Sequence, residues 1–271
     1  MKVQHLRIRP GVKVDITKLD PADTGDVKGK EAAEERLKAN LKRLVELQTV
    51  LYAENRRAVL VVLQGMDGSG KDGTVRHVMS GLNPMGVDII GFKRPTEEEL
   101  DHDFLWRCHR VCPRRGDITV FNRSHYEDVL VVRVNKVINR AEWLRRYRQI
   151  NDWERMLTED GTVIVKCFLH ISKGEQRERL EARLHDPLKN WKFEEGDLAV
   201  RKQWNAYMGR GGAYEDMLRA TSTPYAPWHV IPSDKKWYRN LAVSSLLLAT
   251  LEGMKLEMPA PVKDWRRVRV E

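Results

Sequence analysis

Residues 65–73 form a glycine-rich segment, Gly-Met-Asp-Gly-Ser-Gly-Lys-Asp-Gly, of a kind that binds phosphate. Glycines let successive backbone N–H groups point inward at an anion, and Lys71 adds a positive charge beside the outer phosphates. An apolar run at 58–63 precedes the segment, and a helical pattern begins at Lys71. Strand, loop and helix in this order favour a P-loop over an ordinary tight turn. The expected phosphate-binding residues are Gly65, Gly68, Ser69, Gly70, Lys71, Asp72 and Gly73.

Two carboxylates interrupt this loop, although the loop is built to hold anions. Asp67 lies within it, and Asp72 stands where a P-loop carries the Ser or Thr that binds Mg²⁺. A carboxylate beside a phosphate is unfavourable unless a cation lies between them. We therefore expect carboxylates, Asp67 first among them, to hold Mg²⁺ or, in its place, Mn²⁺. Asp72 is equally consistent with an acid that the helix dipole favours at a helix N-terminus.

A second polar segment, Asn-Arg-Ser-His-Tyr-Glu-Asp at 122–128, follows the apolar run 118–121. Polar residues directly after a buried strand lie at the carboxyl edge of the sheet, where open α/β sheets bind ligands. Glu127 and Asp128 can join Asp67 as metal ligands if the turn brings them back, or they simply begin a helix. Arg123 suits a phosphate, to which it can donate two parallel hydrogen bonds. The expected nucleotide-binding residues are Asn122, Arg123, Glu127, Asp128 and Arg133.

Basic residues are frequent between 177 and 192. Arg179 and Arg183 are four residues apart and therefore share one helix face, and Lys189 lies in the loop that follows. A solvated basic face is one interpretation. The other is a lid, formed by helices at about 174–220, whose arginines close over phosphates and stabilise charge during transfer.

Apolar runs alternate with helical patterns along the chain, and this order predicts a parallel, doubly wound sheet flanked by helices in a single α/β domain, 1–271. Residues 1–30 are expected to form an N-terminal arm, either extended or a short ordered lead-in, and 259–271 a loosely attached C-terminal tail. Thr96 and Glu99 have the spacing of a capping box, and Ser172 is expected to cap the helix that follows it. Lys166 is the polar exception in the fourth apolar run. Strands are expected at 58–63, 87–92, 118–121, 162–169 and 225–231, and helices at 31–54, 71–82, 96–110, 129–137, 141–159, 174–184, 196–220 and 234–254. The helix at 196–220 is expected to be interrupted by Gly209, Gly211 and Gly212.

The composition favours a globular protein with an anionic partner. The chain has 271 residues and a net charge of +9, which does not choose between nucleic acid, polyphosphate and nucleotide. No apolar run has the length of a membrane span and no signal peptide is visible, so we expect a cytoplasmic protein with no membrane partner. The odd number of cysteines, Cys108, Cys112 and Cys167, favours free thiols over disulfides or a zinc site.

Three segments together, 65–73, 121–131 and 183–193, closely resemble the polyphosphate kinase 2 family, and the middle one is most similar to its class III branch. The resemblance covers about residues 40–255. It implies a thymidylate-kinase-like P-loop kinase fold with a helical lid, and a homo-oligomer, either dimer or tetramer. It also implies reversible, Mg²⁺-dependent transfer of the terminal phosphoryl group of inorganic polyphosphate to ADP and AMP, forming ATP.

The family pattern assigns roles to individual residues of this chain. It implies that Asp67, Lys71, Arg123 and Arg183 are catalytic, and that Lys189 binds phosphate. Arg179, which shares a helix face with Arg183, is expected to bind phosphate as well. Other branches often carry Asp where this chain has Asn122, which leaves open whether nucleoside mono- or diphosphates are the favoured acceptors.

Two further hypotheses make different predictions. An ATP-dependent nucleotide kinase of the same fold would not accept polyphosphate in place of ATP. A nucleic-acid-binding protein whose P-loop only senses nucleotide would bind DNA or RNA in a salt-sensitive way. Against the second hypothesis, the sequence has no recognition helix, zinc spacing or RNA-binding aromatic signature, so we expect no nucleic-acid partner.

Overall fold

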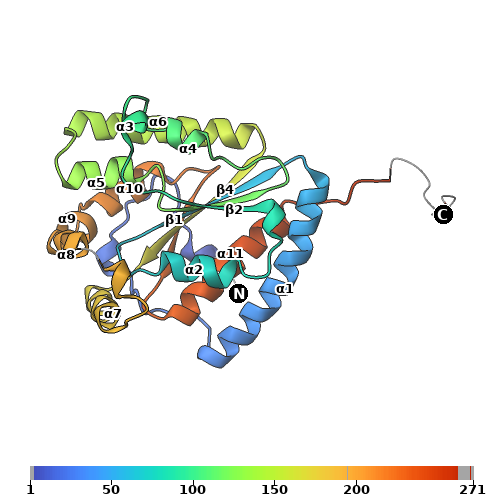
Figure 1. The fold of residues 1–271 in the computed structure, drawn as a ribbon, viewed down its shortest axis with the longest axis horizontal. Helices are drawn as coiled ribbons and strands as arrows, with labels where there is room; N and C mark the ends of the chain where they lie inside the picture. Colours follow the sequence, from blue (N-terminus) through green and yellow to red (C-terminus); the bar gives the residue numbers. More distant parts are fainter. Residues whose placement is uncertain (1–2, 194, 262–268, 270–271) are drawn as a thin grey trace.

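Five parallel strands form one sheet at the centre of the molecule (Figure 1). The computed structural model describes residues 3–193, 195–261 and 269. Within them the strand order is β2-β3-β1-β4-β5, so the chain winds outward in both directions from β1. This arrangement confirms the predicted parallel, doubly wound α/β fold. The strands are β1 (Ala58–Gln64), β2 (Val87–Gly91), β3 (Ile118–Asn122), β4 (Thr162–His170) and β5 (Trp228–Pro232).

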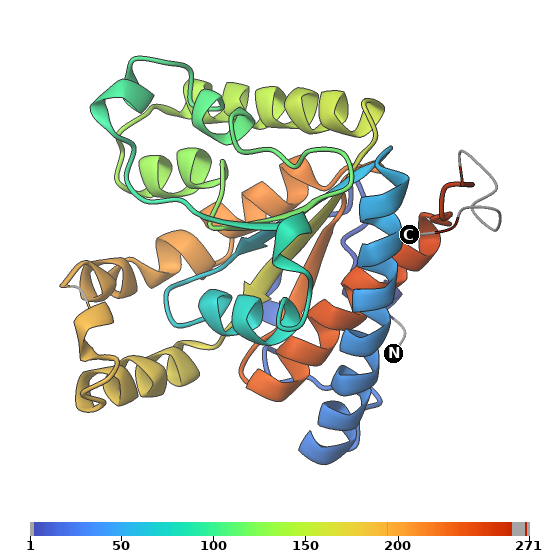
Figure 2. The same cartoon turned by 45° about the vertical axis from the view of Figure 1, so that its right-hand side comes forward.

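Helices cover both faces of this sheet, as the two views in Figures 1 and 2 show. One face carries α1, α2 and α11, which pack on one another, and the other carries α5, α6 and α10. The long helices are α1 (Lys30–Glu54), α6 (Arg140–Glu159), α7 (Lys173–His185) and α11 (Lys236–Gly253). The shorter ones are α2 (Lys71–Val78), α3 (Glu97–Leu100), α4 (Trp106–His109), α5 (Glu127–Val134), α8 (Glu195–Lys202), α9 (Trp204–Met208) and α10 (Ala213–Thr221).

The central strand β1 belongs to two hydrophobic cores. Successive side chains of a strand point to opposite faces of the sheet. Leu60 and Val62 accordingly pack with α5 and α6, whereas Val59, Val61 and Leu63 pack with α1 and α11. Burial on both faces explains why this run is apolar without alternation, and it fixes the position of the polar loop that follows β1.

The predicted N-terminal arm is docked on the sheet beside β5. The Ile8 N–H donates a hydrogen bond to the Trp228 carbonyl at 2.8 Å, and Arg7 forms an antiparallel bridge with His229. Leu6 and Ile16 are buried against the cores. The arm is therefore an ordered part of the domain. The division into arm, domain and lid as functional units stays a prediction.

Three element predictions differ from the structure. The expected helix at 96–110 is two short helices, because the Asp103 side chain accepts the Leu105 N–H at 2.9 Å and forms a turn between them. The capping box at Thr96 and Glu99 is present. The helix that begins at Lys71 ends at Val78 rather than at 82. The interruption expected at Gly209, Gly211 and Gly212 is present, between α9 and α10, but the helix at 196–220 is divided once more, between α8 and α9.

Ser172 caps α7 by accepting the Glu175 N–H, as predicted. Of the predicted C-terminal tail, 262–268 and 270–271 lie outside the described residues. Within the described residues, no helix combines the length and the apolar character that crossing a membrane requires.

Candidate active site

The glycine-rich segment forms a loop between β1 and α2, as the sequence predicts. Gly65 and Gly70 have φ values of 153° and 99°, which residues with a side chain rarely adopt. A Cβ atom on Gly65 would lie 2.7 Å from the Leu169 carbonyl oxygen, so the loop passes directly against β4. Lys71 Nζ curls back over the loop and donates to the carbonyls of Gly65 at 2.7 Å and Met66 at 3.2 Å. Burial, together with the nearby Arg123 charge, lowers the pKa of the Lys71 ammonium.

The Arg123 guanidinium lies between the carboxylates of Asp67 and Glu127. Its Nη2 donates to Asp67 Oδ1 at 2.5 Å, and its Nη1 lies 3.6 Å from Glu127 Oε2. Gln64 Nε2 donates to the other Glu127 oxygen at 2.9 Å, and Lys71 Nζ lies 3.9 Å from Asp67 Oδ1. Arg123 has a φ of 64°, so the strand end makes a sharp turn that aims its side chain at the loop. The structure thus brings four predicted site residues together.

Asp128 has a different set of partners from its neighbour Glu127. Arg107 Nη2 donates to Asp128 Oδ2 at 3.0 Å, and both side chains are buried. Burial raises the pKa of Asp128, against the lowering effect of the Arg107 charge. Adjacent residues on a helix point about 100° apart, which explains why only Glu127 faces the loop. A metal ligand at Asp128 stays a prediction, but the geometry favours Glu127.

The acids that face the loop suit a magnesium ion. Among the described residues, no group of three or more His, Cys, Asp or Glu side chains forms a metal cage. Mg²⁺ in kinases is usually bound by one or two carboxylates, with substrate phosphates and waters completing its shell. Asp67 and Glu127 meet this requirement, since both carboxylates lie beside a loop shaped for phosphate.

The other predicted cations lie farther from the centre of this site. Arg179 contacts the loop, but through carbonyls: its Nη1 donates to Gly68 at 2.9 Å and to Ser69 at 3.2 Å. Arg183 pairs with Asp197 at 3.1 Å, and Lys189 pairs with Asp186. Arg133 forms an ion pair with Asp216 at 2.8 Å and lies over the ring of Trp143. Phosphate or nucleotide contacts from Arg133, Arg183 and Lys189 therefore stay predictions.

A buried polar network beneath the site was not predicted. Glu154 and Lys166, both fully buried, form an ion pair at 2.6 Å. Tyr126 donates to Glu154 Oε1 at 2.7 Å and accepts from Lys166 Nζ at 2.8 Å, while His125 lies 3.2 Å from the same Glu154 oxygen. His125 and Tyr126 stand between Arg123 and Glu127 in the chain, so the network holds the segment that carries both. The sequence signal for this network was Lys166, the single lysine in an otherwise apolar strand.

The sequence also contained no indication of two further residues that lie close to Asp67 and Glu127. Gln176 of α7 is fully buried and donates to the Asp67 backbone carbonyl at 2.8 Å. Tyr207 of α9 is buried as well, and burial, with the Glu127 and Asp67 charges, raises its pKa to about 12. The helices of the predicted lid thus reach the site through these two residues.

A search for related proteins identifies the family. The family model described as Polyphosphate kinase 2 (PPK2) matches residues 27–259. The chain belongs to the polyphosphate kinase 2 family. It is 50% identical to the AMP/ADP-polyphosphate phosphotransferase of Meiothermus ruber, over 99% of this chain and 100% of that protein. It is 45% identical to the ADP-polyphosphate phosphotransferase of Rhodopseudomonas palustris, over 96% of this chain and 93% of that protein.

A solved structure of the polyphosphate kinase 2 family has the same fold. The crystal structure of polyphosphate kinase 2 from Arthrobacter aurescens superimposes with a TM-score of 0.91 at 46% identity, covering 96% of this chain and 92% of that one. The family membership and fold implied by the sequence resemblance are therefore confirmed. The roles of individual residues are not tested by this likeness and stay predictions.

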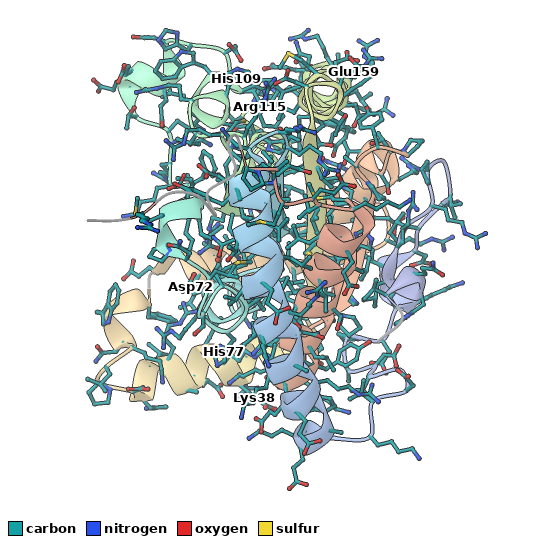
Figure 3. The ribbon with its side chains drawn as sticks, turned by 90° about the vertical axis from the view of Figure 1, so that its right-hand side faces the viewer. Lys38, Asp72, His77, His109, Arg115 and Glu159 are labelled. Atoms are coloured by element: carbon teal, nitrogen blue, oxygen red, sulfur yellow. The ribbon has the colours of Figure 1, made fainter. Side chains whose placement is uncertain are left out.

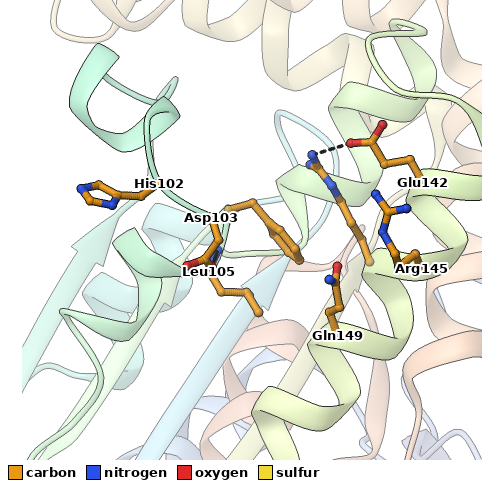
Figure 4. Close-up of a pocket in the computed structure, with 8 residues that line it drawn as sticks. His102, Asp103, Leu105, Glu142, Arg145 and Gln149 are labelled. Atoms are coloured by element: carbon orange, nitrogen blue, oxygen red, sulfur yellow. Dashed lines mark hydrogen bonds and ion pairs between the residues drawn. The ribbon is translucent and has the colours of Figure 1, made fainter.

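One pocket of this polyphosphate kinase 2 protein lies away from the phosphate loop. It measures about 390 Å³ and lies between residues 102–105 and α6 (Figure 4). Arg146, which lines it, already pairs with Glu142 at 2.9 Å and donates to the Asp128 carbonyl. We assign it no role in the reaction.

Cys108 and Cys112, whose spacing was weighed as a zinc site, are also distant from the loop. In Figure 3, His109 lies near one end of the molecule, well separated from Asp72 and His77 of α2. Cys108 and Cys112 are free, and burial raises the pKa of the Cys112 thiol to about 12. His109 Nδ1 accepts a hydrogen bond from the Trp153 indole. These groups are thus engaged in packing.

Proposed function

We propose that this protein transfers the terminal phosphoryl group of inorganic polyphosphate to ADP, forming ATP, and to AMP, forming ADP and, after a second transfer, ATP, in reversible reactions. The observation that carries the proposal is Arg123, held between Asp67 and Glu127 beside the Lys71 ammonium at a phosphate loop. This arrangement suits the transfer of a phosphoryl group between two polyanions. Relatives that match nearly the whole chain are named phosphotransferases for polyphosphate with AMP or ADP.

The chemistry requires positioning and charge stabilisation more than proton transfer. A terminal phosphate oxygen of the nucleotide attacks the terminal phosphorus of polyphosphate, forming a new P–O bond. The bond from that phosphorus to its bridging oxygen breaks, and the shortened polyphosphate keeps the electron pair and the negative charge. Because a nucleotide phosphate is largely ionised near neutral pH, no strong general base is needed.

Each residue at the site has a part in this reaction. The loop N–H groups and Lys71 bind phosphate oxygens. Arg123 stabilises the charge that builds up on the phosphoryl group in transit. Asp67 and Glu127 would hold Mg²⁺, which neutralises phosphate charge when bound. Arg183 of α7 would supply a second positive charge.

We propose two further properties. Cytoplasmic localisation is supported by the acceptors, because AMP and ADP are nucleotides of that compartment. Homo-oligomerisation, as a dimer or tetramer, is supported by the edge strand β2, where Ile89 is 48% exposed. Apolar residues on an open sheet edge are usually covered.

The test is a luminescence assay for ATP made from polyphosphate and Mg²⁺ with either ADP or AMP. Wild type is compared with Asp67→Ala and with Asp152→Ala, a control in an exposed surface pair. We expect ATP from both acceptors in wild type and control, and none in Asp67→Ala. ATP from ADP alone would reject the AMP activity. No ATP from either acceptor, with the protein folded, would favour the kinase that uses ATP as donor.

A further inference from the structure

A buried arginine lies against the phosphate loop without an acidic partner. Arg239, in the first turn of α11, is 2% exposed. Its Nη1 donates to the Ser69 carbonyl at 3.3 Å, and its Nη2 donates to Asn240 Oδ1 at 2.9 Å. Among the described residues no carboxylate pairs with it, and burial, then the charge of Arg179, lowers its pKa to about 9. A buried charge in this setting is costly unless something else compensates it.

A second arginine reaches the same carbonyl from another helix. Arg179 of α7 donates through Nη1 to Ser69 at 3.2 Å, as well as to Gly68. Its Nη2 donates to the carbonyls of Ser233 at 2.6 Å and Asp234 at 2.8 Å. Arg179 therefore ties the loop to α7 and to the turn before α11, and the Ser69 carbonyl accepts hydrogen bonds from two arginines.

This contact determines where the next N–H group points. In a trans peptide the C=O and the following N–H point in opposite directions, and the described chain has no cis peptide bonds. With the Ser69 carbonyl held toward the two arginines, the Gly70 N–H points away from them, to the opposite side of the loop. A phosphate loop binds its anion with the N–H groups on one side and its carbonyls turned to the other.

Two glycines of the loop make room for Arg239. A Cβ atom on Gly70 would lie 1.7 Å from Arg239 Nη1, and one on Gly73 would lie 3.0 Å from Nη2. The sequence interpretation assigned both glycines to phosphate binding alone. The structure adds a second reason for them, the close approach of a guanidinium group to the outer side of the loop.

We propose that Arg179 and Arg239 are positioning residues for polyphosphate binding: they hold the Ser69 carbonyl on the outer side of the loop and thereby aim the Gly70 N–H at a polyphosphate oxygen. Arg179 is neutralised by Glu175, whose Oε1 accepts from Arg179 Nε at 2.7 Å. The charge of Arg239 has no such partner and lies one peptide plane behind the anion, so bound polyphosphate offsets the cost of burying it. This inference rests on the proposed function, because it concerns the same substrate.

The experiment compares Arg239→Met and Arg179→Met with wild type and with Arg177→Met, a control on an exposed face of α7. Calorimetric titration with inorganic polyphosphate, without nucleotide, gives Kd, and steady-state assays give KM for polyphosphate and for ADP. We expect Kd and KM for polyphosphate to rise about 10- to 100-fold, as for other residues that orient a binding group. KM for ADP should change little, and Arg177→Met should match wild type.

Thermal unfolding separates this role from a structural one. We expect ligand-free Arg239→Met to unfold at or above the temperature of wild type, since an unpaired buried cation is replaced by an apolar side chain. Added polyphosphate should stabilise wild type more than the variant. Arg239→Lys, which can still donate to the Ser69 carbonyl, should recover part of the affinity. If Arg239→Met does not fold, Arg239→Lys and Arg179→Lys carry the test, with a smaller rise in KM for polyphosphate expected.

The outcomes separate the positioning role of the two arginines from the proposed function. Unchanged Kd and KM for polyphosphate, or equal rises in KM for polyphosphate and ADP, would overturn the inference. If wild type makes no ATP yet binds polyphosphate, and the arginine variants lose that binding, the proposed function fails while the positioning role stands. If wild type does not bind polyphosphate, both fail.

Discussion

The Asn122 side-chain amide donates a hydrogen bond to Asp72 Oδ1 at 2.9 Å, joining the end of β3 to the first turn of α2. The two residues occupy the positions at which this chain departs from the usual P-loop pattern. Asp72 replaces a hydroxyl residue, and Asn122 stands where an acid commonly ends the strand. The contact relates the two departures, because an uncharged donor at 122 is compatible with a carboxylate at 72.

Replacing Asn122 by Asp should therefore impair activity. Asn122→Asp places two carboxylates in contact beside a phosphate loop, where like charges repel. We expect kcat/KM for ADP to fall about 10-fold, the factor that corresponds to about 1.4 kcal/mol. The exchange Asn122→Asp with Asp72→Asn keeps one acid and one amide, and should recover most of the loss. Equal activity of single and double variants would contradict the coupling.

Arg123 should be needed for the transfer step. Arg123→Ala removes the cation between Asp67 and Glu127, and we expect kcat to fall about 10³-fold, as for arginines that stabilise phosphoryl transfer. Arg123→Lys keeps the charge but not the fork that spans both acids, so it should recover only part. Steady-state kinetics of the Arg123 variants test this expectation, with Arg155→Ala as the control, because Arg155 belongs to an exposed ion pair. A loss confined to KM would argue against a transition-state role.

The buried pair of Glu154 and Lys166 should dominate the response of stability to mutation. Glu154→Gln leaves the Lys166 ammonium buried and uncompensated, and we expect the free energy of unfolding to fall by about 3–5 kcal/mol. Adding Lys166→Met to Glu154→Gln should restore much of it. Urea unfolding of both variants, with exposed Glu159→Gln as the control, tests this. A loss below about 1 kcal/mol, the scale of a surface pair, would contradict it.

The sequence predicted the parts of this site that are local or that the topology brings together. The phosphate loop is one continuous segment. Arg123 and Glu127 follow a strand that pairs directly with β1, and neighbouring parallel strands end at the same edge. Residue type and strand order were therefore enough to place them beside Asp67. Residue type and strand order do not indicate in which direction an individual side chain points. For that reason the sequence could not distinguish Glu127, which faces the loop, from Asp128.

The remaining site features depend on contacts between distant segments. Arg239 lies 170 residues beyond Ser69, and Glu154 lies 28 residues beyond Tyr126. Nothing in the local pattern of α11 or α6 indicates which polar side chain turns inward, because tertiary packing decides it. The prediction of one helix at 96–110 was wrong for a related reason. The start of the helix at Thr96 was predicted correctly, but the hydrogen bond from the Leu105 N–H to the Asp103 side chain competes with continuation of the helix.

The protein should lose stability as the pH falls below neutrality. Burial lowers the pKa of His229 to about 4 from its ordinary value of 6.5, and the charges of Arg7 and Lys166 act in the same direction. Between about pH 6.5 and pH 4 the unfolded chain therefore binds a proton that the folded protein does not. The free energy of unfolding must then decrease as the pH falls through this window.

The expected size follows from the width of that window. From pH 7 to pH 5 His229 alone should reduce the free energy of unfolding by about 2 kcal/mol, because each pKa unit corresponds to about 1.4 kcal/mol. His125 and His170, whose pKa values burial also lowers, add to the loss. His229→Gln keeps a donor for the Lys166 carbonyl, which His229 Nδ1 contacts at 3.3 Å, and cannot titrate. Urea unfolding at pH 7 and pH 5 should show a smaller decrease in this variant, and an unchanged decrease would mean that His229 takes up its proton in the folded protein.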